Sequence, residues 1–297
     1  MYLEHFGLAR QPFRLTPDTA LFFSGSERGA ALEALKFTLE EGIGIVKVVG
    51  EIGTGKTMLC HMLANSLPRT TDVIYIINPS LPPIEMLVTI ALEMNIPAQE
   101  HWPKAKLMQA LMHQLLVKHA QNRQVILLIE EAQCVPIETL EEIRLLSNLE
   151  TGQAKLLQIV LFGQPELDQH LSTPKIRQLQ DRIHHQFYLK PFTKSDINHY
   201  LNHRLQASGY RGPGLFNQAA TKAIQKYSKG LARKINLLAD KAMLIAYANN
   251  RLSINSDDIR QAARDTKAQK THWVALPWVM IGIMYLSLGV LLFNSLA

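Results

Sequence analysis

The chain has 297 residues, 47% of them hydrophobic, so it can bury a sizeable core and is too long for one small domain. Its net charge of +6 fits a protein near anionic lipid or nucleic acid but does not choose between these partners. The sequence contains no internal repeat, which excludes repeat architectures. Cys60 and Cys134 lie in or next to apolar runs, and we expect reduced thiols of a cytosolic domain.

The N-terminal residues 1–13 include charged side chains and no long apolar run, which argues against a secretory signal peptide. Residues 28–41 predict a helix with one apolar face. Aromatic side chains recur before this predicted helix, and we expect them to pack against an edge of the sheet, with contact to an adenine ring as the alternative. These side chains are Phe6, Phe13, Phe22 and Phe23.

A phosphate-binding loop follows the first predicted strand. Residues 50–57 match the pattern G-x-x-x-x-G-K-[ST], between a β-branched run at 45–49 and a helix-forming run at 58–64. The glycines let backbone N–H groups turn toward phosphate oxygens, and the helix N-terminus adds partial positive charge. Lys56 can then reach the β- and γ-phosphates, and the Thr57 hydroxyl can bind Mg²⁺. The predicted nucleotide-binding residues of the loop are Gly50, Glu51, Ile52, Gly53, Thr54, Gly55, Lys56, Thr57 and Met58.

An acidic pair follows the next strongly apolar strand, predicted at residues 125–129. The run is apolar throughout, as in a strand buried on both faces, and it ends in Glu130 and Glu131. A carboxylate at such a strand end can hold the hydration shell of Mg²⁺, and the next carboxylate can orient the attacking water. We therefore assign Glu130, with Thr57, to the metal ion and Glu131 to catalysis. Two plain surface glutamates are the alternative.

Three further signals lie later in the chain. Residues 156–162 predict another buried strand, after which Gln164 could contact the γ-phosphate or the water. Arg177 and Arg182 precede a strand predicted at residues 186–189. Arg233 opens a long helix whose apolar residues face the other way, so its side chain can point at a nucleotide.

This order of strand, glutamine, arginine and helix-opening arginine resembles the AAA+ ATPases. The strings FGL, PF and TPD within residues 6–18, followed by EEAQ, LFGQPEL, DRI and GLARKIN, resemble the ExeA/GspA family of secretion ATPases. The resemblance extends over residues 1–265 and is nearest to the members that serve an MSHA (type IV) pilus. It implies that ATP and Mg²⁺ are the cofactors.

The resemblance also implies roles for individual residues. Glu131 would be the catalytic carboxylate and Gln164 the sensor 1 residue. Arg233 would be the sensor 2 arginine. Arg182 would be the arginine finger given to a neighbouring subunit, with Arg177 as its rival. The implied partners are further copies in a homo-oligomeric ring, together with inner-membrane pilus or secretion proteins.

The chain departs from this family at Glu130, where aspartate is usual. The extra methylene changes how far the carboxylate reaches toward a metal ion.

Three parts are expected along the chain. Strands alternate with helices from Ile45 to Leu189, which predicts an α/β fold with a parallel sheet and helices on both faces. Residues 1–190 are assigned to the AAA+ nucleotide-binding domain and residues 191–270 to an all-α lid. Residues 271–297 are assigned to a C-terminal transmembrane segment. Thr193 and Asp196 predict a capping box at the start of the lid.

The transmembrane prediction rests on residues 274–293. This stretch carries no charge and would span about 30 Å as a helix, which matches the hydrocarbon core of a bilayer. Trp273 and Trp278 suit a membrane interface, and the basic residues that precede the stretch predict a cytoplasmic N-terminal side. A buried terminal helix is the alternative.

Three functions compete for this sequence. The first is a single-pass ATPase of the bacterial inner membrane that supports assembly of a type IV pilus or a type II secretion-like machine. The second is a DNA-associated ATPase of the transposition or replication-initiator type. The third is a nucleotide-binding scaffold with little turnover. The sequence shows no appended helix-turn-helix, zinc finger or Lys/Arg-dense arm, which makes nucleic acid the less favoured partner.

Overall fold

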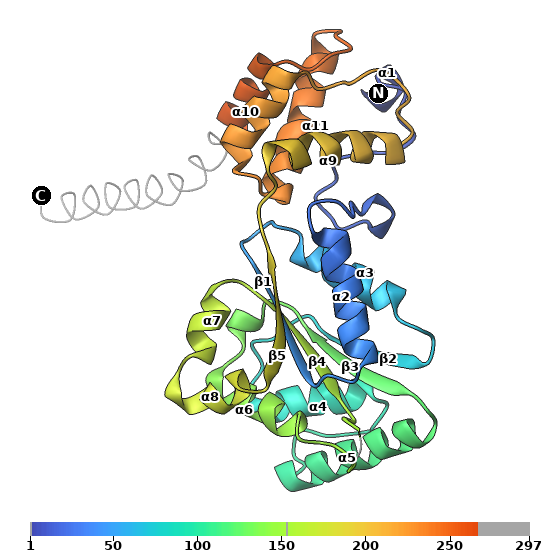
Figure 1. Ribbon diagram of the computed structural model, residues 1–297, viewed down its shortest axis with the longest axis vertical. Helices are drawn as coiled ribbons and strands as arrows, with labels where there is room; N and C mark the ends of the chain where they lie inside the picture. The colour runs from blue at the N-terminus through green and yellow to red at the C-terminus, as the bar shows by residue number, and fades with distance from the viewer. Residues whose placement is uncertain (1, 153, 267–297) are drawn as a thin grey trace, which may run out of the picture.

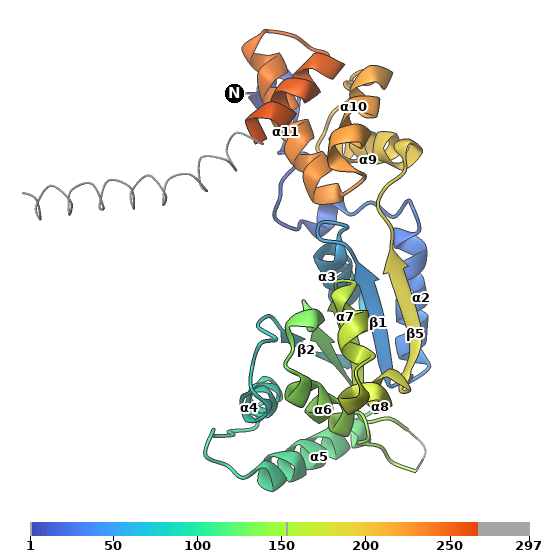
Figure 2. The ribbon, with the colours of Figure 1, turned by 90° about the vertical axis from the view of Figure 1, so that its left-hand side faces the viewer.

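A computed structural model describes residues 2–152 and 154–266 of the chain. Figure 1 shows an α/β part built on a sheet and, beside it, a helical part formed by the later residues. The N-terminal residues lie next to this helical part in both Figure 1 and Figure 2.

The sheet has five strands in the order β2-β3-β4-β1-β5, and every neighbouring pair is parallel. The prediction of a parallel α/β sheet is therefore confirmed. The strands are β1 (Ile45–Gly50), β2 (Thr71–Ile76), β3 (Gln124–Ile129), β4 (Gln158–Gly163) and β5 (Ile183–Leu189). The fifth strand begins earlier than predicted, because Ile183 already pairs with Ile45 of β1.

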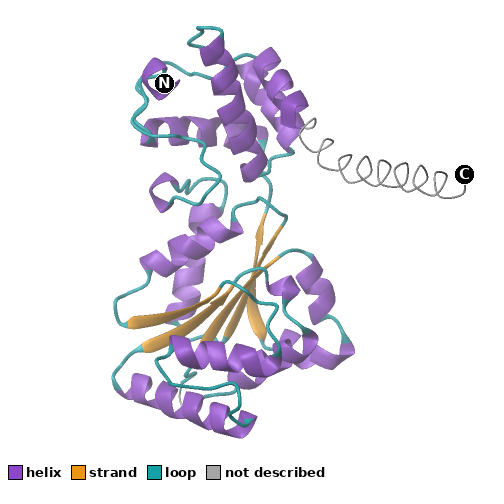
Figure 3. Ribbon diagram, turned by 180° about the vertical axis from the view of Figure 1, so that it is seen from behind, coloured by secondary structure: helices purple, strands orange, loops and turns teal. Residues whose placement is uncertain are grey.

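Helices cover both faces of the sheet, as Figure 3 shows. Alternate residues of β3 point to opposite faces, so Ile126 and Leu128 contact one cluster while Leu127 and Ile129 contact the other. One face is covered by α2 (Arg28–Glu40) and α3 (Lys56–Ser66). The other is covered by α4 (Pro83–Glu93), α5 (Lys104–Ala120), α6 (Ile137–Leu146), α7 (Glu166–Leu171) and α8 (Arg177–Gln180).

The helical part contains α9 (Lys194–Ala207), α10 (Gln218–Ser228), α11 (Ala232–Ala248) and a last helical stretch at residues 256–266. The predicted capping box is confirmed at its start. The Thr193 hydroxyl accepts from the Asp196 N–H, and the Asp196 carboxylate accepts from the Thr193 N–H at 2.8 Å. Short elements complete the description: α1 (Tyr2–His5) and the 3₁₀ turns Thr19–Leu21, Ala132–Cys134 and Pro174–Ile176.

The N-terminal segment packs on the helical part rather than on a sheet edge. Phe6 and Phe13 are buried in the same cluster as α9–α11, and the Phe13 ring meets Phe216 edge-on at 5.8 Å. The buried Arg204 of α9 donates hydrogen bonds to the carbonyls of Pro12, Leu21 and Arg14. The expectation that these two aromatics pack against an edge of the sheet was therefore wrong. They fill part of the hydrophobic core of the helical part instead, although they lie far from α9–α11 in the sequence.

The predicted transmembrane stretch, residues 274–293, lies outside the described residues. Within residues 2–152 and 154–266, no helix combines the length and the apolar character needed to cross a bilayer.

The packing of the N-terminal segment can be tested with Phe13→Ala. Phe13 is 1% exposed, so its truncation should lower the free energy of unfolding by about 3–5 kcal/mol. Phe37→Ala is the matched control, because Phe37 is 63% exposed on α2 and should change stability by less than about 0.5 kcal/mol. Urea denaturation followed by circular dichroism measures both. Equal effects of the two substitutions would contradict the packing.

Candidate nucleotide-binding site

The phosphate-binding loop joins the end of β1 to the start of α3. Gly53 and Gly55 have φ angles of +83° and +107°, a region that side chains rarely adopt, so glycine is needed at both positions. Helix α3 begins at Lys56, immediately after Gly55. The unpaired N–H groups of its first turn thus belong to the loop itself, which is the arrangement that binds phosphate at a helix N-terminus.

Lys56 lies inside this loop. Its ammonium group donates to the carbonyls of Gly50 at 2.7 Å and Glu51 at 3.3 Å, and its side chain is buried. Burial lowers the pKa of Lys56, although the nearby carboxylates of Glu131 and Glu130 oppose this shift. Burial disfavours the charged form of Lys56, so the negative charge of a phosphate group beside the ammonium would stabilise that form.

Glu130 and Thr57 form the candidate metal site. The Thr57 hydroxyl donates to Glu130 Oε2 at 2.6 Å, and Glu130 Oε1 accepts a hydrogen bond from the Tyr75 hydroxyl. Glu130 is 8% exposed, and both of these hydrogen bonds come from neutral hydroxyls, so a cation would complement its buried charge. Carboxylate and hydroxyl oxygens are also the ligand type that Mg²⁺ prefers. The residues present therefore fit the predicted ion.

Glu131 and Gln164 lie together at the ends of β3 and β4. The Gln164 side-chain amide donates to Glu131 Oε2 at 2.9 Å, and the Gln133 amide donates to the same oxygen at 2.7 Å. The Gln164 backbone N–H in turn donates to Gln133 Oε1 at 3.0 Å. Glu131 itself has a left-handed backbone, with φ 48° and ψ 41°, which turns its side chain away from the direction of β3.

The electrostatics keep Glu131 ionised. Burial by itself would raise the pKa of this carboxyl, but the hydrogen bonds from Gln164 and Gln133 and the charge of Lys56 outweigh burial, and the pKa is lowered. At neutral pH the group is thus a carboxylate that can accept a hydrogen bond from water.

A cavity of about 430 Å³ lies between the loop, the N-terminal segment and the helical part. Its volume is in the range of small-molecule sites. Arg233 lines it, and the Arg233 backbone N–H donates to the Gly53 carbonyl at 3.1 Å, so α11 starts directly on the loop. Phe22 and Phe23 also line the cavity, which keeps the predicted adenine contact open for these two residues.

Several lining residues had no sequence motif, and Arg28 is the most informative. Its guanidinium group donates to the carbonyls of Thr54 at 2.9 Å and Lys190 at 3.2 Å, and it lies 3.6 Å above the Phe192 ring. It therefore ties the phosphate loop to the connection between β5 and the helical part. Burial lowers the pKa of Arg28 to about 10, so it remains charged at neutral pH. The sequence did contain one signal for Arg28. It is a cation at the start of a predicted helix, where the helix dipole disfavours positive charge.

Arg182 and Arg177 do not join this cavity. Arg182 precedes β5 at the edge of the sheet where β1 begins, whereas the phosphate loop follows the other end of β1. A strand of six residues spans about 20 Å, which is beyond the reach of an arginine side chain. Neither arginine lines the cavity that holds Lys56 and Arg233. Any contact of Arg182 with a nucleotide therefore has to be made to another chain.

The comparisons with known proteins agree with this geometry. Residues 39–171 match the family model "AAA domain". The chain is 38% identical over 263 residues to general secretion pathway protein A of Aeromonas hydrophila. The chain belongs to the ExeA/GspA family of AAA ATPases. The aligned region is 89% of this chain but 48% of that relative, so the chain spans about half the length of the curated relative it matches.

Solved structures with the same fold include an ORC2 protein and a Cdc6 protein. The ORC2 protein of Aeropyrum pernix, in its ADPNP and ADP complexes, has a TM-score of 0.62 at 19% identity and covers 86% of this chain and 71% of its own. Cdc6p of Pyrobaculum aerophilum has a TM-score of 0.63 at 18% identity, with 84% and 71% covered. At these identities the similarity establishes a shared fold only.

The two carboxylates can be separated by substitution. Glu131→Gln should lower the rate of ATP hydrolysis by about 10²–10⁴-fold while ATP binding is kept, because an amide activates water poorly. Lys56→Ala should instead weaken ATP binding by about 10- to 100-fold, because it removes the charged donor of the loop. Equilibrium binding and phosphate-release assays measure the two effects. Normal turnover in Glu131→Gln together with a dead Glu130→Gln would mean that the roles are reversed.

Proposed function

We propose that this protein hydrolyses ATP to support assembly of a type IV (MSHA-like) pilus or a type II secretion-like machine. The observation that carries the chemistry is the meeting of Glu131 and Gln164 at the strand ends beside Lys56. The pathway is supported by the identity to general secretion pathway protein A over 89% of the chain. The sequence pattern also resembles the shorter pilus-type members of the family, such as MshM.

The roles in hydrolysis follow from charge and position. The loop N–H groups and Lys56 bind the phosphates, and Thr57 with Glu130 would hold Mg²⁺, which supplies charge neutralisation on the phosphates. Glu131 accepts a hydrogen bond from the attacking water, and Gln164 fixes the orientation of the Glu131 carboxylate. Arg233, at the start of α11, faces the cavity from the helical part and acts there as a lid arginine.

Self-association completes the proposal. Arg182 lies too far from the loop of its own chain to contact that nucleotide, so it acts on a neighbouring subunit in a homo-oligomeric ring. An arginine supplied in this way can contribute about 10³–10⁵ in rate. Within its own chain, Arg182 is near Glu150. The pKa of Glu150 is lowered mainly by the hydrogen bond from Lys155 and also by the charge of Arg182.

The trans role can be tested by mixing two inactive variants. Arg182→Ala and Lys56→Ala should each lose hydrolysis, and a mixture should regain part of it at sites that pair an intact loop with an intact Arg182. Arg177→Ala is the matched control, since Arg177 is exposed on α8 and should keep activity. Recovery is read as phosphate release after co-assembly has been verified by pull-down. Co-assembled mixtures that stay inactive would argue against a trans role.

Membrane attachment is the second part of the proposal. Residues 274–293 have the length and apolar character of a membrane span, and Arg260, Arg264, Lys267 and Lys270 precede them. This bias of basic residues favours a cytoplasmic ATPase part in the bacterial inner membrane. The position of ATP in the cytoplasm requires the same orientation.

The topology can be tested with a reporter after Ala297. An enzyme that is active only in the periplasm should be active at this position, and the protein should sediment with membranes until detergent is added. Removal of residues 272–297 should release it into the soluble fraction. Cytoplasmic reporter activity, or a full chain that remains soluble without detergent, would contradict the proposal.

The DNA-associated alternative has weaker support. Its basis is the net charge of +6 and the fold shared with ORC proteins at 17–19% identity, one of them an ORC1 protein solved in complex with DNA. Salt-sensitive binding of duplex DNA by the chain would favour it over the secretion proposal.

A further inference from the structure

Tyr75 and His61 extend the candidate metal site beyond the residues that carry its motif. Strands β2 and β3 pair so that Tyr75 lies opposite Leu128, two residues before Glu130. Residues two apart share a face of a strand, so Tyr75 and Glu130 are diagonal neighbours on the face that α3 covers. Thr57 and His61 are one helical turn apart on α3, so both can face this pair of strands.

These four side chains form a continuous line of hydrogen bonds. Thr57 donates to Glu130 Oε2 at 2.6 Å, Tyr75 donates to Glu130 Oε1, and the Tyr75 oxygen lies 3.2 Å from His61 Nε2. A tyrosine hydroxyl has a single proton. Since Tyr75 gives that proton to Glu130, its oxygen accepts, and His61 carries a proton on Nε2.

The environment keeps Tyr75 in its donor form. Burial raises the pKa of Tyr75, and the hydrogen bond to Glu130 raises it further. The hydrogen bonds to Glu130 and to His61 thus hold the Tyr75 hydroxyl as a donor to the carboxylate. Cys60, which is fully buried beside this pair, is likewise kept as a thiol because burial raises its pKa.

Glu130 has one more rotatable bond than an aspartate would have at this position. An additional bond lets the carboxylate adopt more positions, and ordering it costs conformational entropy. Here each carboxylate oxygen is held by a different hydroxyl, one from α3 and one from β2. We propose that Tyr75 is a positioning residue that fixes the Glu130 carboxylate for Mg²⁺, and that His61 holds the Tyr75 hydroxyl in the orientation this requires.

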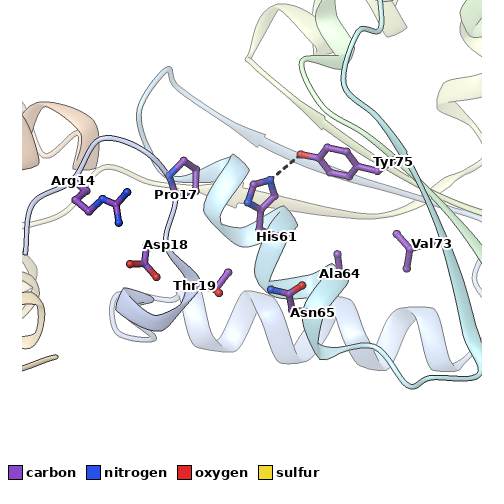
Figure 4. A pocket seen from close by; sticks show the side chains of 9 residues that line it. All are labelled: Arg14, Pro17, Asp18, Thr19, His61, Ala64, Asn65, Val73 and Tyr75. Carbon is purple, nitrogen blue, oxygen red and sulfur yellow. Dashed lines mark hydrogen bonds between the residues drawn. The ribbon is translucent and has the colours of Figure 1, made fainter. Parts of the chain in front are cut away.

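His61 also connects this line to an open pocket on the outside of α3. The pocket has a volume of about 610 Å³, and His61 and Tyr75 lie in its wall together with Arg14 and Asp18 (Figure 4). The tilted rings of His61 and Tyr75 have centroids 5.8 Å apart. The histidine is thus reached from the pocket, whereas Glu130 at the other end is buried.

The inference rests on the proposed nucleotide function and is tested by the Mg²⁺ dependence of ADP binding, measured at equilibrium with a fluorescent ADP. Tyr75→Phe removes only the hydroxyl. It should raise the Mg²⁺ concentration for half-maximal tightening of ADP binding by about 10-fold or more, the usual effect of losing a partner that orients a metal ligand. Affinity for ADP without Mg²⁺ should be unchanged, which also shows that the site is folded.

Four companion variants separate positioning from a general structural effect. Tyr188→Phe is the matched control, because this 52% exposed tyrosine bonds Gln186 on β5 and should leave the Mg²⁺ requirement unchanged. His61→Phe should raise the Mg²⁺ concentration for half-maximal tightening of ADP binding. His61→Gln can keep an N–H donor near the same place, so this concentration should return to the value of the parent protein. In the background of Glu130→Asp, whose shorter side chain withdraws from Tyr75, the Tyr75→Phe effect should shrink to within about twofold.

The outcomes distinguish the inference from its premise. A parent protein whose ADP binding does not respond to Mg²⁺ would overturn the proposed function and the inference with it. A parent that responds normally while Tyr75→Phe has the same Mg²⁺ requirement would overturn the inference alone. So would a Tyr75→Phe effect of equal size with Glu130 and with Glu130→Asp, because Tyr75 would then act by a route other than this carboxylate.

Discussion

The parallel pairing of β1, β3 and β4 is the constraint on which the site depends. Val49 of β1 lies opposite Gly163 of β4, and Ile129 of β3 lies opposite Leu161, so the three strands end at one edge. The residues that follow each strand must then meet there: the phosphate loop, the two glutamates and Gln164. Hydrolysis needs charged groups and amides within hydrogen-bond distance of one another. The strand register brings these groups together because each of them directly follows the end of a strand.

A second set of contacts encloses the site on the side of the helical part. Two buried arginines make these contacts. Arg28 donates hydrogen bonds to the phosphate loop and to the start of the helical part, and Arg204 donates hydrogen bonds to carbonyls of the N-terminal segment. Their charges are buried, so their hydrogen bonds to carbonyls are costly to break. The loop, the N-terminal segment and α11 are therefore coupled mechanically, and a nucleotide placed between them would contact all three.

The sequence predicted the parts of this protein that depend on short-range patterns. Largely apolar runs of four to seven residues marked the strands, and the glycine and lysine spacing marked the phosphate loop, because those signals come from neighbouring residues. Tyr75 and Arg28 escaped prediction, since what matters about them is which strand or loop they reach in space. Phe13 was assigned to the wrong surface for the same reason: an apolar residue signals burial but not its partner. The functional roles of all the site residues, Arg182 and Arg233 among them, still stand as predictions.

The most direct test of the account is a structure of the full chain with Mg²⁺ and a non-hydrolysable ATP analogue. The account predicts phosphates enclosed by residues 50–57, with Lys56 on the terminal phosphates, the ion on the side of Thr57 and Glu130, and Glu131 and Gln164 beside the γ-phosphate. Nucleotide bound elsewhere, or an ion held by Glu131 with Glu130 turned away, would contradict it.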